Sequence, residues 1–308
     1  MASSSFAGVL VPVLTPFTRS GEPDAGRFVA FCRWLLDQGA DGLAIFGTTS
    51  EANSMSAGER MALLDRLIAA GIPAAKLMPG SGACSISEAA TLARHAVEHG
   101  CGGVLMLPPF YYKGMPDEGL FAFIAGVADR VASSALKVYL YHIPPVAQVG
   151  FSLDLIARLI KAYPATVVGL KDSSGDWSNT AALLQNFPGF AVFPGSEVFL
   201  LDGLRKGAAG CITASGNVNV PGIRKVYQNW QGPQADALQA EITNVRKTIQ
   251  AYPMVPALKA IVAHFHKDPD WAAVKPPMVP LDAAQASALL ADLARIGFSL
   301  GERQQQAA

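Results

Sequence analysis

The sequence has few cysteines, and none of them has the spacing of a cross-link. The four that occur, Cys32, Cys84, Cys101 and Cys211, are scattered singly with no C-x-x-C pair. Neither a disulfide framework nor a zinc-binding cluster is therefore indicated. We expect a protein of the reducing cytoplasm, with no metal ion and no other cofactor.

An excess of one charge sign and long apolar runs are also missing. Lysine plus arginine and aspartate plus glutamate each number 24, so no basic stripe favours a nucleic acid or an anionic membrane as partner. Proline, glycine or charge interrupts every apolar run before the roughly 18 residues that indicate a membrane span. The N-terminal run lacks a basic region and is broken by Pro12, so we expect it to begin the fold.

The chain instead alternates short apolar, glycine-bounded runs with longer stretches of helical periodicity. Strands separated by helices predict right-handed β-α-β units, and eight of them predict an α/β fold closed into a (β/α)8 TIM barrel. An open doubly wound sheet is the alternative, but no G-x-G-x-x-G opens an early helix. The expected strands are Gly8 to Leu14, Gly42 to Phe46, Lys76 to Gly80, Gly103 to Leu107, Lys137 to His142, Val167 to Lys171, Ala191 to Gly195 and Gly210 to Thr213.

No low-complexity linker divides the chain, so we expect residues 1–308 to form a single domain. It comprises a barrel core over 1–220, a C-terminal helical extension over 221–300 and a disordered tail over 301–308. Among the helices, Ser56 with Glu59 predicts a capping box, followed by an apolar stripe that begins at Met61. Ser87 is expected to open the next helix.

One lysine stands at the end of an apolar strand in TVVGLKDSSG, residues 166–175. The valines and leucine before Lys171 fit a strand that is buried on both faces, as in parallel sheets. Burial disfavours the ammonium form of a lysine, and the neutral amine is the nucleophile that forms a Schiff base with a ketone. The alternatives are that Lys171 extends to water or pairs with Asp172.

Hydroxyl and aromatic residues follow other strands, at the end of the barrel where active sites lie. The turn GTTSE at 47–51 offers adjacent hydroxyls and free backbone N–H groups that suit a carboxylate, although a helix cap explains it equally well. Tyr139 and Tyr141 share one face of the fifth strand and point into the barrel if that face is the inner one. The aromatic loop PPFYYK at 108–113 indicates a pocket lid or a subunit interface. Together, an amine, a phenol and hydroxyls are what a class I aldolase needs.

Several segments, in chain order, resemble the dihydrodipicolinate synthase and N-acetylneuraminate lyase family. They are GTTSE at 47–51, PFYYKG and DEGL between 109 and 120, YHIP at 141–144, GLKDSSGD at 169–176 and GSE at 195–197. The similarity covers nearly the whole chain, including the KPP of 275–277. It implies a (β/α)8 barrel, usually a homotetramer built as a dimer of dimers. It also implies action on pyruvate through a lysine Schiff base, without a metal.

The resemblance implies a role for each matching residue. Lys171 matches the Schiff-base lysine, and Tyr141 matches the tyrosine that relays protons to and from the substrate. Thr48 and Thr49 match the positions that bind the pyruvate carboxylate, and Thr48 also belongs to the hydroxyl relay. Tyr112 matches a tyrosine that crosses the dimer interface to complete that relay.

Further substrate contacts are expected after the last two strands. Ile212 matches a backbone contact near pyruvate. The turn of Gly195, Ser196 and Glu197 is expected to bind substrate as well.

Two departures from the family pattern bear on the second substrate. Val146 stands where dihydrodipicolinate synthases have an arginine, so an anionic semialdehyde loses a bidentate partner. Neuraminate lyases hold sugar hydroxyls with an Asp-Glu pair and a serine, of which only Glu197 is present, with Ala214 at the serine position. We therefore expect neither of these enzymes, but a lyase or aldolase that acts on pyruvate or a related 2-oxo acid and an unidentified aldehyde.

Two other functions remain open. One is dehydration of a 2-keto-3-deoxy sugar acid through the same imine, and the other is a barrel that binds 2-oxo acids without catalysis. His95 and His99 have a spacing that binds metal, but a solvated helix face explains them better. His142 is expected to point away from Tyr141.

Overall fold

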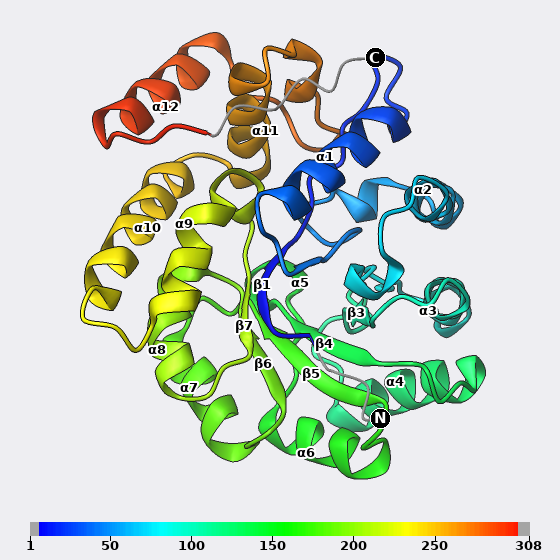
Figure 1. Cartoon of the computed structure of the whole chain (residues 1–308). Helices are drawn as coiled ribbons and strands as arrows, with labels where there is room; N and C mark the ends of the chain where they lie inside the picture. The colour runs from blue at the N-terminus through cyan, green and yellow to red at the C-terminus, as the bar shows by residue number, and fades with distance from the viewer. Residues whose placement is uncertain (1–5, 301–308) are drawn as a thin grey trace.

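Parallel strands form the centre of the structure, a computed structural model that describes residues 6–300 (Figure 1). One group has the order β2-β1-β7 and the other the order β3-β4-β5-β6. The ranges are β1 (Gly8–Val11), β2 (Gly42–Leu43), β3 (Val104–Met106), β4 (Val138–His142), β5 (Val167–Asp172), β6 (Ala191–Pro194) and β7 (Gly210–Ile212).

Backbone contacts join the two groups into a closed barrel. On one side, residues 77–80 lie between β2 and β3, with bridges from Leu77 to Leu43 and from Gly80 to Leu105. On the other, the N–H before β7 donates to the Val192 carbonyl of β6 at 3.0 Å. The (β/α)8 TIM barrel predicted from the sequence is confirmed.

The third predicted strand, Lys76 to Gly80, is not regular. Lys76, the first residue of the predicted strand, belongs to the 3-10 helix η2 (Ala74–Lys76). Leu77 and Gly80 form only isolated bridges to neighbouring strands. Pro79 has no N–H to donate, which prevents a continuous ladder. The backbone still occupies the place of a barrel strand, because the Pro79 carbonyl accepts from the Leu105 N–H at 2.9 Å.

The barrel strands are buried on both faces, as predicted. Along β4, Tyr139 and Tyr141 belong to the cluster inside the barrel, whereas Val138 and Leu140 pack with the surrounding helices. The interior cluster also includes Leu10, Ala44, Met78, Leu105, Phe193 and Ile212. Side chains two apart on a strand therefore share one environment, and only the strand ends can present polar groups.

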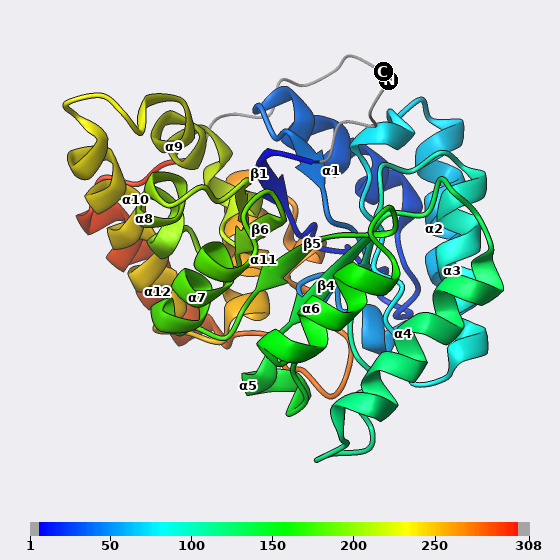
Figure 2. The ribbon, with the colours of Figure 1, turned by 90° about the horizontal axis from the view of Figure 1, so that it is seen from below.

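Helices surround the strands, as the view from below also shows (Figure 2). The ranges of these helices are α1 (Ala25–Asp37), α2 (Ala57–Ala69), α3 (Ile86–Glu98), α4 (Asp117–Val131), α5 (Pro144–Ala147), α6 (Leu153–Ala162), α7 (Trp177–Asn186) and α8 (Leu200–Arg205). The Ser56–Glu59 capping box is confirmed at the start of α2, but Ser85 rather than Ser87 caps α3.

Within residues 6–300, four α-helices follow β7: α9 (Gly216–Asn229), α10 (Ala235–Gln250), α11 (Met254–Phe265) and α12 (Ala283–Arg295). The division predicted between residues 220 and 221 falls inside α9, next to a kink at Asn219. Leu258, Ile261 and Val262 of α11 are buried in the same apolar cluster as the barrel's outer face. The tail predicted over 301–308 lies outside the described residues.

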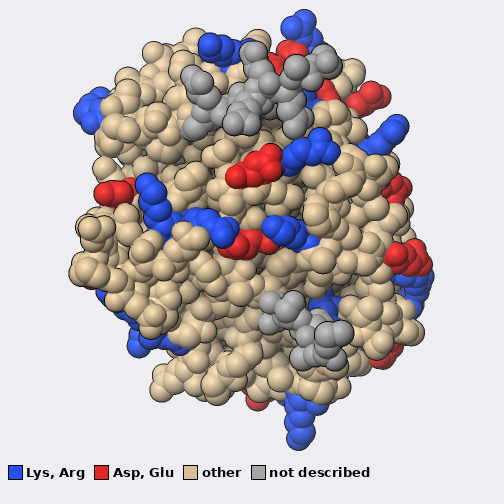
Figure 3. Space-filling view, viewed as in Figure 1, with Lys and Arg blue, Asp and Glu red and all other residues tan. Residues whose placement is uncertain are grey.

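The molecular surface carries both charge signs. On the face in Figure 3, basic and acidic side chains are dispersed, with some of opposite sign side by side. Within residues 6–300, no helix is both long and apolar enough to cross a bilayer.

Candidate active site

The side chain of Lys171 lies inside the barrel against Tyr141. Its Nζ is 3.3 Å from the Tyr141 hydroxyl and 4.3 Å from the centroid of the ring. Lys171 is only 4% exposed. The hydrogen-bond partner of this buried amine is thus a phenol.

A shift in register between β4 and β5 turns Lys171 inward. Val138 pairs with Val167, but Tyr139 pairs with Gly169 and Tyr141 with Lys171, so β5 has one extra residue. If the register of Val138 and Val167 continued without this shift, Tyr141 would pair with Leu170, and the lysine would face the helices. The glycine fits this arrangement, because a Cβ on Gly169 would lie 2.4 Å from the Tyr139 ring.

The carboxylate next in sequence faces the other way. Asp172 accepts hydrogen bonds from the Thr180 hydroxyl at 2.6 Å and the Ser174 N–H at 3.0 Å. Neighbouring strand residues point to opposite faces, so Asp172 is directed away from the barrel interior. The pairing of Lys171 with Asp172 that the sequence allowed is wrong.

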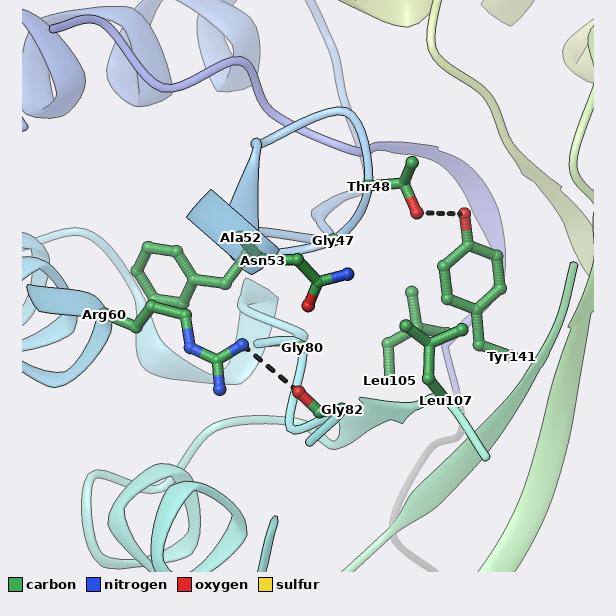
Figure 4. Close-up of a pocket in the computed structure, with 11 residues that line it drawn as sticks. Gly47, Thr48, Ala52, Asn53, Arg60, Gly80, Gly82, Leu105, Leu107 and Tyr141 are labelled. Carbon is green, nitrogen blue, oxygen red and sulfur yellow. Dashed lines mark hydrogen bonds between the residues drawn. The ribbon is translucent and has the colours of Figure 1, made fainter. Parts of the chain in front are cut away.

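Tyr141 connects Lys171 to the turn after β2. Its hydroxyl donates to Thr48 Oγ1 at 3.3 Å, and the two groups point toward each other in Figure 4. An amine, a phenol and an alcohol thus form a chain of polar groups at the C-terminal ends of the strands. Such a chain can pass a proton along its hydrogen bonds.

The turn that carries Thr48 and Thr49 has an unusual backbone. Phe46 and Glu51, which flank it, both have left-handed conformations, with φ of 59° and 58°. Each such residue costs on the order of 1 kcal/mol, and such strain is concentrated at functional sites. Ser50 anchors the turn from inside, because its buried hydroxyl donates to the Val13 carbonyl and accepts from the Gly47 N–H at 3.3 Å.

A fully buried ion pair holds Glu51 in place. Its carboxylate contacts the ammonium of Lys259 on α11, and neither side chain is exposed. It also accepts from the Lys275 N–H at 2.6 Å, while Lys259 donates to the Ala273 carbonyl at 2.6 Å and lies 4.3 Å from the Phe17 ring centroid. Burial lowers the pKa of Lys259 to about 8, although Glu51 opposes that change. No sequence pattern indicates this pair, because its members are more than 200 positions apart.

Glu197, on the opposite rim, is satisfied within the protein. It begins the 3-10 helix η3 (Glu197–Phe199), is fully buried and accepts from the hydroxyls of Thr213 and Ser215. Arg246 of α10 lies 3.4 Å from it. Both carboxylate oxygens are thus engaged before any substrate binds.

The other residues of the predicted turn also have structural partners. The Gly195 N–H donates to the Asp172 carbonyl at 2.6 Å, and the Ser196 hydroxyl accepts from the Val198 N–H at 3.4 Å. Ile212 on β7 is fully buried inside the barrel.

Tyr112 lies apart from the buried groups. Its side chain is 68% exposed in the loop before α4, where it makes an edge contact with Tyr111 at 5.2 Å between centroids. His142 points away from Tyr141 as predicted, because its Nδ1 accepts from the Phe151 N–H at 3.0 Å. Burial lowers the pKa of His142.

A small pocket, partly open to solvent, extends from Thr48 and Tyr141 toward α2 (Figure 4). Arg60 lines it and is 4% exposed, with Nη1 donating to the Gly82 carbonyl at 3.3 Å. Burial lowers the pKa of Arg60. The stripe predicted from Met61 is confirmed at Leu64 and Leu67, but Met61 itself is only partly buried, and the buried face of α2 begins with Arg60 and Leu63. An arginine on the apolar stripe was the signal that could have revealed this residue.

Comparisons with known proteins agree on one family. A model of the dihydrodipicolinate synthetase family matches residues 5–296. A Chloroflexus aurantiacus protein described as an uncharacterized DapA-like lyase is 33% identical over 94% of this chain and 96% of its own. A 4-hydroxy-tetrahydrodipicolinate synthase of Rhizobium meliloti is 30% identical over 95% of this chain and 99% of its own. The crystal structure of dihydrodipicolinate synthase from Agrobacterium tumefaciens has a TM-score of 0.88 and 31% identity, covering 94% of this chain and 99% of that one.

The buried ion pair leads to a prediction about stability. Glu51→Gln leaves the Lys259 ammonium buried without its counter-ion, so the free energy of unfolding should fall by about 3 kcal/mol or more. Urea unfolding followed by circular dichroism measures the change. Asp236→Asn, which removes an exposed ion pair with Arg205, is the matched control and should leave the midpoint unchanged. Equal midpoints for Glu51→Gln and wild type would show that the pair does not stabilise the turn.

Proposed function

The chain belongs to the dihydrodipicolinate synthetase family, and on that premise we propose that it is a class I lyase or aldolase whose Lys171 forms a Schiff base with pyruvate or a related 2-oxo acid. The contact between the buried amine and the phenol carries this proposal. Lys171 Nζ lies 3.3 Å from the Tyr141 hydroxyl, which lies 3.3 Å from Thr48 Oγ1. A buried amine beside a proton donor is the arrangement that imine chemistry requires.

The turn after β2 binds the carboxylate of the 2-oxo acid in this proposal. Thr48 and Thr49 supply hydroxyls and backbone N–H groups, and the strained backbone keeps these donors in place before the substrate arrives. Ile212 contributes a backbone contact on the other side of pyruvate. The ketone carbon then lies within reach of Lys171.

The reaction proceeds through an enamine. The neutral amine of Lys171 adds to the ketone carbon, and the carbinolamine loses water to give an iminium ion. Loss of a proton from the adjacent carbon gives the enamine, which adds to an aldehyde carbon. Water then cleaves the imine and releases the product. Tyr141 moves the protons in these steps, and Thr48 continues the relay. Cleavage is the same sequence in reverse.

The second substrate in this proposal is an aldehyde that carries no carboxylate near Val146. Val146 is 63% exposed on α5 and offers no hydrogen-bond donor there. On the opposite rim of the barrel, the Glu197 carboxylate is occupied by the hydroxyls of Thr213 and Ser215. Glu197 therefore acts on the substrate by positioning the turn that it shares with Gly195 and Ser196. We therefore propose that the chain acts neither as a dihydrodipicolinate synthase nor as an N-acetylneuraminate lyase.

Assembly completes the site in this proposal. Tyr111 and Tyr112 are 73% and 68% exposed, and paired aromatic side chains at a surface are typical of an interface. Tyr112 extends across that interface and joins the relay of a neighbouring subunit. We propose a homotetramer, built as a dimer of dimers in the cytoplasm, that uses no cofactor.

Tyr141→Phe tests the proton relay. Enamine formation exchanges the methyl protons of pyruvate with deuterium from D2O, which NMR follows without an aldehyde. Because the variant lacks the phenolic proton, the exchange rate should fall by about a hundredfold, while the imine remains trappable with borohydride. Tyr163→Phe, which changes a surface tyrosine, is the control and should exchange at the wild-type rate. Undiminished exchange in Tyr141→Phe would remove this residue from the mechanism.

Mixed oligomers test whether Tyr112 acts across an interface. When inactive Tyr112→Phe and Lys171→Ala chains are refolded together, one of the two sites in each mixed dimer is complete. Activity per chain should therefore recover to roughly a quarter of wild type. Mixtures of Tyr141→Phe with Lys171→Ala should stay inactive, because these two residues belong to the same chain. Confirmed mixed dimers with no recovery would exclude a shared site.

A further inference from the structure

One histidine of α3, the histidine at its C-cap and an aspartate of α2 converge at the surface between these helices. His95 and His99 are four residues apart, and both direct Nε2 toward Asp65 Oδ1, at 2.9 Å and 2.8 Å. The two rings are nearly perpendicular, at 85°, with centroids 4.6 Å apart. The three ligand atoms all lie within 4.8 Å of one another.

We propose that Asp65, His95 and His99 form a binding site for a divalent transition-metal ion, with zinc as the best fit, that links α2 to α3. The sequence alone favoured a solvated helix face for the two histidines. The structure adds a carboxylate from a second helix, which sequence spacing could not reveal. Two imidazoles and one carboxylate oxygen are ligands that zinc prefers.

The geometry needs only a small adjustment to accept the ion. Ligand atoms about 2.0–2.2 Å from zinc in a tetrahedral site are about 3.3 Å apart. The nitrogens lie 2.8–2.9 Å from the Asp65 oxygen, so each must move about 0.5 Å away from that oxygen. His95 and His99 are 21% and 28% exposed and Asp65 is 53% exposed, which leaves room for this movement. The exposure also leaves a fourth position open to water.

The site is remote from Lys171. Helices of a (β/α)8 barrel run back from the catalytic end, so the last turns of α2 and α3 lie at the opposite end of the strands. Figure 1 shows α2 and α3 next to each other outside the barrel. The ion therefore joins two helices and takes no part in the Schiff-base chemistry. Its binding energy adds to the stability of the folded chain.

Zinc binding to the purified full chain tests the proposal. All variants carry Cys84→Ser, because Cys84 is the exposed cysteine and its thiolate is also a zinc ligand. After EDTA treatment and dialysis, calorimetric titration with zinc chloride should show one ion per chain. His99→Ala and Asp65→Asn should each weaken the affinity by roughly tenfold to a hundredfold. At the same zinc concentration, the melting temperature should rise more for the parent than for either variant.

Two controls separate a metal site from a hydrogen-bonded cluster. His264→Ala removes an exposed histidine on α11 and should bind zinc like the parent. Asp65→Asn keeps an oxygen that accepts hydrogen bonds, so a melting temperature near that of the parent without metal shows that the variant is folded. Absence of one-to-one binding to the parent would overturn the proposal. Zinc affinity that is unchanged in both His99→Ala and Asp65→Asn would also overturn it.

Discussion

The shift in register between β4 and β5 is the constraint on which the candidate site depends. The extra residue in β5 changes which side chains face inward, so Lys171 rather than its neighbour pairs with Tyr141. Asp172 is then directed to the helices, where a threonine hydroxyl and a backbone N–H satisfy it. The amine is left in an apolar interior with a phenol as its partner. The shift thus decides that Lys171, and not the neighbouring Asp172, faces the barrel interior.

The second element of the site is a strained turn that the distant C-terminal helices hold in place. Glu51 keeps its left-handed conformation because Lys259 and the Lys275 N–H bind its carboxylate. A buried ion pair of this kind adds little net stability, since desolvation offsets the attraction, but it fixes geometry. The C-terminal extension therefore has a structural role at the site. It fixes the turn from which Thr48 approaches Tyr141.

Several parts of this arrangement could be predicted from the sequence, and the reasons are local. Apolar runs bounded by glycine predicted the barrel, and their order placed Lys171, Tyr141 and Thr48 at the same end of it. The third strand was predicted as regular because the pattern was apolar, although Pro79 cannot complete a ladder.

What the sequence did not reveal depends on contacts between distant segments. The sequence around Lys259 does not indicate that this lysine pairs with Glu51, which is distant in the chain. The contact of Asp65 with two histidines likewise depends on the packing of α2 on α3. The register shift also depends on pairing between two strands, and no pattern within β5 alone specifies it. The chemical roles of the site residues stay predictions, since geometry shows only which groups meet.

Trapping of the Schiff base decides whether Lys171 is the nucleophile. Wild-type protein and the Lys171→Ala variant are incubated with pyruvate and borohydride, and intact mass followed by peptide mapping locates the adduct. We predict one pyruvate-sized adduct on the peptide that contains Lys171, retained when the exposed Lys206 is replaced by alanine and lost in Lys171→Ala. An adduct on Lys259, the other buried lysine, or no adduct with any 2-oxo acid tested, would contradict it.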